Sequence, residues 1–162
     1  DVLLELEESL VLCNTGTGHN SGDIHQDQRQ QKDKDRILQK VKSNVALTYK
    51  ARNHLLRGRL FEFGQSLHEA WQLKRQCSEK ISTDRIDKIY HDALSHGAVG
   101  GKLLGAGGGG FFLFYVPPFS KHELVNGLEA AGLKIRPFRF EHEGLVAWST
   151  REGKHPLETE EI

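Results

Sequence analysis

The sequence of 162 residues contains no methionine and only two cysteines. Without methionine it does not begin at an initiator, and its first residues already match a strand, so we expect a domain cut from a longer protein. Cys13 and Cys77 lie far apart, which excludes a disulfide framework and a Cys-x-x-Cys metal or redox site. We expect both cysteines to be reduced.

Excess charge and long apolar runs are also absent. The 22 basic residues balance the 22 acidic ones, so nothing favours nucleic acid or an anionic membrane as a partner. No apolar stretch approaches the roughly 20 residues that span a bilayer, and the first residues do not show the basic-then-apolar pattern of a leader. We therefore expect a cytoplasmic protein with one well-buried domain, residues 1–150, followed by a polar tail, residues 151–162.

Glycine, by contrast, is concentrated in one place. Residues 100–114 include seven glycines and lead directly into an apolar run. Glycine reaches positive φ without strain, and its missing Cβ allows other groups to approach the backbone. A loop of this composition can point several amides at one anion, most usefully a phosphate.

The glycine spacing within residues 105–110 formally fits the dinucleotide-binding fingerprint, which needs a strand before the loop and a helix after it. Here we expect a helix at residues 84–96 before the loop and a strand at residues 111–116 after it. This order argues against a Rossmann site. No Gly-Lys-Ser or Gly-Lys-Thr closes the loop, so a Walker phosphate loop is excluded as well.

The apolar periodicity predicts an α+β domain built on a mainly antiparallel sheet. A ferredoxin-like core with additional helices on one face is the best topology. A capping box at residues 120–123 should open the last helix, and Gly132 should close it. The expected strands are residues 2–6, 9–14, 111–116, 135–141 and 144–149. The expected helices are residues 24–57, as one long helix or two in line, 60–78, 84–96 and 120–131.

Residues 102–111, Lys-Leu-Leu-Gly-Ala-Gly-Gly-Gly-Gly-Phe, resemble the third, C-terminal motif of the GHMP small-molecule kinases. The resemblance is closest to the sugar-kinase branch that contains heptose 7-phosphate kinases and fucokinases. It implies that the chain is the C-terminal half of an ATP-dependent sugar or sugar-phosphate kinase. The implied site loop, whose amides would stabilise the transferring phosphoryl group, consists of Gly105, Ala106, Gly107, Gly108, Gly109 and Gly110.

The same resemblance implies that much of the machinery lies outside this chain. In the family, a missing N-terminal domain supplies the other phosphate loop, the carboxylate that holds Mg²⁺ and the candidate base, while ATP is the phosphoryl donor. The catalytic residues are therefore unknown from this sequence. We expect the chain alone to turn over no substrate.

A second polar stretch, residues 15–23, resembles the Thr-Gly-x-x-basic-x-Ser segment of the same kinases. Alternatively, the stretch is a strand-to-helix turn in which Ser21 or Asp23 caps the following helix. The usual basic residue is arginine, and a neutral histidine cannot hold phosphate as a guanidinium does. The candidate substrate-side residues are Thr15, Gly16, His19 and Ser21, with Lys102 as a further positive charge.

Other functions remain open at this point. The nine histidines show no helical ligand pair beside a carboxylate, so we predict no metal site within this chain. The chain could instead be a non-catalytic ligand-binding or regulatory module, in which the glycines form only a packing turn. Another GHMP branch, such as galactokinase or mevalonate kinase, is a third alternative.

Overall fold

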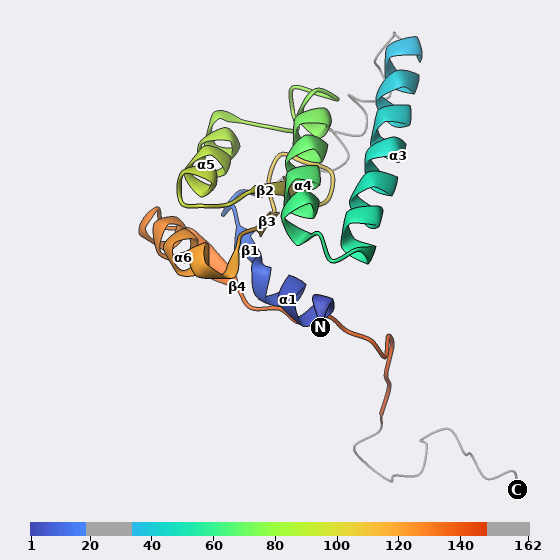
Figure 1. Cartoon of the computed structure of the whole chain (residues 1–162). Coiled ribbons are helices and arrows are strands. Elements are labelled where there is room, and N and C mark those ends of the chain that lie inside the picture. The colour runs from blue at the N-terminus through green and yellow to red at the C-terminus, as the bar shows by residue number, and fades with distance from the viewer. Residues whose placement is uncertain (19–33, 149–162) are drawn as a thin grey trace, which may run out of the picture.

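The computed structural model describes residues 1–18 and 34–148, which form one sheet with helices around it (Figure 1). In chain order the elements are α1 (Val2–Ser9), β1 (Leu10–Asn14), α3 (Lys34–Leu56), α4 (Leu60–Arg75), α5 (Asp84–Ser95), β2 (Gly100–Leu103), β3 (Phe111–Tyr115), a 3-10 turn (Pro118–Ser120), α6 (Lys121–Ala130) and β4 (Lys134–Arg136).

The sheet is antiparallel throughout, with the strand order β2-β3-β1-β4. Helices connect β1 to β2 and β3 to β4, so the order is that of a ferredoxin-like core. Val11 pairs with Phe114, and Leu103 pairs with Phe112. The predicted α+β class and topology are confirmed.

The main hydrophobic core lies between the sheet and helices α5 and α6, which run together on one side of it (Figure 1). Phe112 and Phe114 stack with a centroid distance of 5.0 Å, and Trp71 meets Phe112 edge-on at 5.3 Å. Alternation along β3 explains this arrangement, because residues two apart on a strand share a face. Other fully buried members are Cys13, Ile86, Ala93, Leu103, Leu124 and Leu128.

Helix α4 lies against β2 at a distance that only glycine allows. A Cβ atom on Gly100 would overlap the carbonyl oxygen of Gly64, and one on Gly101 would overlap the ring of Phe114. The missing side chain of Gly100 lets the backbone of α4 pack directly on the edge strand, whereas that of Gly101 leaves room for the Phe114 ring. We predicted no strand at residues 100–103, but they form β2.

The opposite face carries a smaller cluster made by Leu6, Leu10, Leu60 and Tyr115. Leu6 comes from α1, where we predicted a strand over residues 2–6. The helix forms because the Asp1 carboxylate accepts from the Leu3 amide at 2.9 Å and because only one side of it, through Leu6, faces the core. The apolar run that suggested a strand is left largely exposed.

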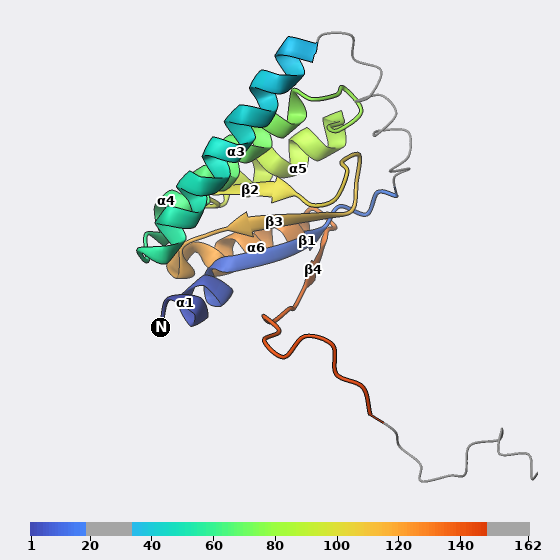
Figure 2. The same cartoon turned by 90° about the vertical axis from the view of Figure 1, so that its right-hand side faces the viewer.

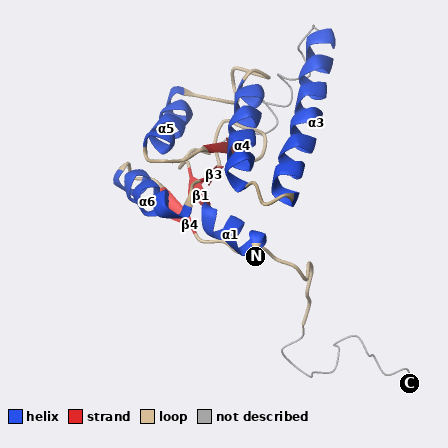
Figure 3. Cartoon of the chain, in the orientation of Figure 1, coloured by secondary structure: helices blue, strands red, loops and turns tan. Residues whose placement is uncertain are grey.

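The C-terminal strand pair that we predicted does not form. Only Lys134–Arg136 pairs with the sheet, and its partner is β1 rather than residues 144–149. Pro137 follows β4 at once and has no amide to continue the ladder. Residues 137–148 are irregular, and Figure 3 shows this stretch as loop.

Local signals set the boundaries of α5. Thr83 caps α5 by accepting from the Ile86 amide at 3.3 Å, and Gly97 ends this helix region at φ +93°. The capping box of α6 is not made, because Ser120 already has helical dihedrals from the 3-10 turn and its side chain accepts no capping bond. Residues 24–33 of the predicted first helix lie outside the described residues, and none of the described helices is long and apolar enough to cross a membrane.

Candidate functional site

The connection between β2 and β3, residues 104–110, is called the glycine loop below. Both β1 and β2 run antiparallel to β3, so their C-terminal ends lie at the same edge of the sheet. Residues 15–18, which follow β1, therefore reach the glycine loop, as Figure 2 shows. This edge is the candidate functional site, and a strand rather than a helix follows the loop, as the argument against a Rossmann site required.

Hydrogen bonds join these two segments. The amide and the hydroxyl of Thr15 each donate to the Gly110 carbonyl at 2.9 Å, and the Gly110 amide donates to the Thr17 carbonyl at 3.2 Å. Arg85, from the first turn of α5, donates to the Thr15 carbonyl at 3.1 Å from Nη2. The structure thus brings Thr15 and Gly16 next to the glycine loop, whereas His19 and Ser21 lie outside the described residues.

Two glycines are fixed by close packing. A Cβ on Gly109 would overlap the Thr17 carbonyl oxygen, and one on Gly107 would lie 3.0 Å from Cα of Ile81. The Gly108 amide also donates to the Ile81 carbonyl at 2.9 Å. Gly105 differs, because a Cβ there would meet nothing within 4 Å and only its φ of +70° requires glycine.

Four loop amides have no acceptor among the described residues, and of these four residues Gly105 is exposed, Ala106 is half-buried, and Gly107 and Gly109 are buried. Within the described ranges, the amides of Gly105, Ala106, Gly107 and Gly109 donate to no protein acceptor. Several unpaired amides on one glycine-rich turn are the arrangement that binds an anion such as phosphate. The loop geometry therefore permits the phosphate-binding role that the sequence predicted.

Lys74 is a site residue that sequence reasoning missed. It lies in the last turn of α4, and its ammonium donates to the carbonyls of Leu103 at 2.7 Å and Gly105 at 2.6 Å. Burial, and then the charge of Lys102, lower the pKa of Lys74 to about 8. No sequence spacing links a residue of this helix to a loop about thirty positions later, so only the structure could find it.

Lys102 lies in β2 and not in the loop. It pairs with Leu113, on the face of the sheet that α4 covers, and it lines a cavity of about 300 Å³ with residues of α3 and α4. Its charge lowers the pKa of Lys74, and within the described part of the chain its ammonium makes no hydrogen bond to the loop backbone. A substrate-side role for Lys102 stays a prediction.

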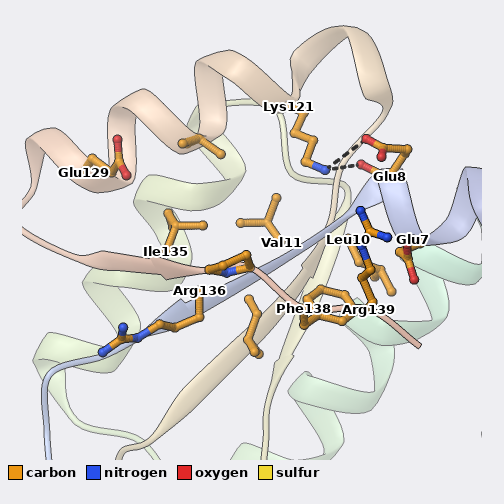
Figure 4. Close-up of a pocket in the computed structure, with 13 residues that line it drawn as sticks. Glu7, Glu8, Leu10, Val11, Lys121, Glu129, Ile135, Arg136, Phe138 and Arg139 are labelled. Carbon is orange, nitrogen blue, oxygen red and sulfur yellow. Dashed lines mark hydrogen bonds and ion pairs between the residues drawn. The ribbon is translucent and has the colours of Figure 1, made fainter. Parts of the chain in front are cut away.

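A further cavity of about 410 Å³ lies between β1, α6 and residues 135–139 (Figure 4). Figure 4 shows Lys121 bonded to Glu8 at its rim, through the Glu8 carbonyl at 2.6 Å and its carboxylate at 3.5 Å. None of the predicted site residues lines this cavity. It is separate from the glycine loop.

The described residues offer no metal centre. In residues 1–18 and 34–148, no group of three histidine, cysteine, aspartate or glutamate side chains lies close enough to hold a metal ion. Asp87, a carboxylate of α5, is already occupied by Arg75 at 2.7 Å and by the Ser82 hydroxyl. The groups that the described part of the site offers an anion are therefore backbone amides and the cationic side chains of Lys74 and Arg85.

Comparison with known proteins places this site in a family context. The model of the C-terminal region of GHMP kinases matches residues 51–132, a range that includes the glycine loop. The D-glycero-alpha-D-manno-heptose 7-phosphate kinase of Campylobacter jejuni is 31% identical over 144 residues, which are 89% of this chain and 42% of that protein.

Solved structures of kinases are also similar to this chain. A D-glycero-D-manno-heptose 1-phosphate kinase from Bacteriodes thetaiotaomicron matches 86% of this chain and 35% of its own, with 27% identity and a TM-score of 0.54. The L. major mevalonate kinase, solved with R-mevalonate, matches 75% of this chain and 37% of its own, with 25% identity and a TM-score of 0.69. The chain thus spans less than half the length of these relatives.

Proposed function

Because the chain belongs to the GHMP kinases, whose C-terminal model covers half of it, we propose that it is the C-terminal part of an ATP-dependent sugar or sugar-phosphate kinase. The relative from Campylobacter jejuni is named for its action on a heptose 7-phosphate, which supports a phosphorylated heptose as the acceptor. The whole protein would transfer the γ-phosphoryl group of ATP to a sugar hydroxyl.

The observation that carries this proposal is the set of unpaired amides on the glycine loop. Charge spreads over the equatorial oxygens of the phosphoryl group during transfer, and amides already aimed at it stabilise that charge without reorganising. Gly105, Ala106, Gly107 and Gly109 supply these donors, and the loop lies inside the matched family region.

Residues 15–18 would form the neighbouring wall on the acceptor side. Thr15 already uses its hydroxyl to hold the Gly110 carbonyl, so its contribution is to fix the glycine loop against this wall. Gly16 reaches φ +68° beside the Arg85 guanidinium, which would add a positive charge there. His19, Ser21 and Lys102 stay proposed substrate-side residues.

The residues present fit the phosphates of ATP better than they fit Mg²⁺. The loop amides suit phosphate oxygens, whereas no carboxylate cluster suits a metal within the described part of the chain. We therefore assign the metal ligand and the base to an N-terminal domain outside this sequence, and relatives more than twice as long have room for it. We expect the complete kinase to act in the cytoplasm, with ATP as its phosphoryl donor.

The test is a transfer assay on the natural protein in its full length. With ATP and Mg²⁺ we expect phosphorylation of a heptose 7-phosphate at a rate at least about 100-fold above that of mevalonate. ³¹P NMR measures the phosphorylated product. The 162-residue chain alone should show no transfer. Absence of transfer to every sugar tested by a folded, full-length protein would overturn the proposal, and preference for mevalonate would move the protein to another branch.

A further inference from the structure

Among the described residues, Lys74 is the charged side chain that donates to the backbone at the start of the glycine loop. Its ammonium bonds the carbonyls of Leu103 and Gly105, which lie on either side of Leu104. An ammonium has three N–H donors, so one side chain makes both bonds at once. Lys74 therefore spans the point at which β2 becomes the loop.

We propose that Lys74 is a positioning residue, which turns the amides of the glycine loop toward the phosphoryl group. The proposal rests on the proposed function, since it names the side chain that sets the geometry of the same site. No bond from Lys74 to a substrate is required, because its effect passes through the loop backbone.

The planar peptide explains how one lysine sets the amide directions. In a trans peptide the C=O and the following N–H point to opposite sides. With the Leu103 carbonyl turned to Lys74, the Leu104 amide must point away, and it donates to the Phe111 carbonyl at 2.8 Å. With the Gly105 carbonyl also turned to Lys74, the Ala106 amide points away from α4, where it has no acceptor in the described part of the chain.

The end of α4 that carries Lys74 is itself held in place. Trp71 lies one turn earlier, is fully buried and contacts Phe112 edge-on at 5.3 Å. Phe112 belongs to β3, the strand on the far side of the loop. The helix that positions Lys74 is thus anchored to the strand that the loop leads into.

The Lys74 ammonium stands in an environment that disfavours its charge, which supports a specific role for this group at the glycine loop. Burial and the charge of Lys102 both disfavour the ammonium, while the two carbonyls favour it. An apolar side chain of similar length would pack at a half-buried helix position without that penalty. The ammonium is the part of Lys74 that the loop uses.

Hydrogen exchange of the loop amides tests the proposal without any kinase assay. In Lys74→Met the amides of Leu104 and Gly108 should exchange at least about tenfold faster than in the unaltered chain, because two bonds to a charged donor are lost. Lys102→Met is the matched control, since it removes the neighbouring charge but no bond to the loop, and its loop amides should be unchanged. Unchanged exchange in Lys74→Met would overturn the proposal.

Kinetics of the full-length protein then separate positioning from general stability. Lys74→Met should lower kcat at least about tenfold with KM for the sugar nearly unchanged, and Lys74→Arg, which keeps the cation and its donors, should restore most of it. Lys50→Met is the kinetic control, since it removes an exposed ion pair with Glu69 of α4 but no bond to the loop. A fall in kcat equal for Lys74→Met and Lys50→Met would overturn the positioning role. If the loop loosens in Lys74→Met but the unaltered protein transfers no phosphoryl group, the positioning of the loop holds and the proposed kinase function fails.

Discussion

The glycine loop and residues 137–148 are both irregular segments, yet their surroundings differ sharply. The loop has almost no side chains, but Lys74, Ile81 and Thr17 bond its backbone from three separate parts of the chain. In the C-terminal stretch, Phe138 and Phe140 pack against the smaller cluster, but beyond them Leu145 is 98% and Trp148 is 79% exposed. The glycine loop is therefore held by bonds to its backbone, whereas the large apolar side chains near the end of the described chain hold nothing in place.

The two tryptophans give the largest test of this contrast. Trp71 is fully buried between Tyr90 and Phe112, so Trp71→Ala should lower the free energy of unfolding by about 3–5 kcal/mol. Trp148→Ala should change it by less than about 0.5 kcal/mol, because that ring contacts little. Urea unfolding of the chain measures the free energy of unfolding of both variants. Equal losses would contradict the contrast, because they would show that the Trp148 ring is packed as closely as the Trp71 ring.

Within the loop, steric contact separates one glycine from another. Gly109→Val should cost about 3 kcal/mol, because the new side chain meets the Thr17 backbone, which cannot move aside. Gly105→Ala should cost only about 1 kcal/mol, since its Cβ meets open space and only the positive φ is strained. Thermal unfolding of the two variants measures the difference. A larger loss for Gly105→Ala would mean that the loop is packed on the side described as open.

The pH dependence of stability tests the environment of Lys74. Its folded pKa of about 8 is below the ordinary 10.5, so between these pH values the unfolded chain binds the proton more strongly. The free energy of unfolding of the unaltered protein should therefore rise, relative to Lys74→Met, as the pH increases from about 8 to 10.5. Because the group is only half-buried, we expect a gain of about 1 kcal/mol. A fall in this difference in the free energy of unfolding over the same pH range would contradict the prediction. It would show that the two carbonyls favour the Lys74 ammonium more than burial disfavours it.

The sequence predicted those parts of the fold in which local pattern and tertiary packing agree. Helix α5 has both a Thr83 cap and an apolar face, and β3 is a continuous apolar run, so both were found. Helix α1 was missed because its apolar residues are mostly exposed, and β2 was missed because two glycines carry no strand pattern. The structure of β2 comes from partners, β3 and α4, that no local window contains.

The candidate site divides in the same way. The glycine loop and Thr15 could be identified from composition and resemblance, because glycine runs mark places where a backbone must come close to another group. Lys74 could not be found, since nothing in the α4 sequence distinguishes it from a solvated lysine. Its role depends on where α4 crosses β2, which the missing side chains of Gly64 and Gly100 determine.

The most direct test of the central claim compares two alanine variants of the full-length protein, Gly105→Ala in the loop and Gly132→Ala after α6. Both glycines have positive φ, at +70° and +78°, and both face open space, so the two substitutions should cost the same stability. If the glycine loop stabilises the transferring phosphoryl group, kcat for transfer from ATP should fall about 10–100-fold in Gly105→Ala and stay unchanged in Gly132→Ala. Equal kcat values in the two variants would contradict the assignment of the glycine loop to the active site.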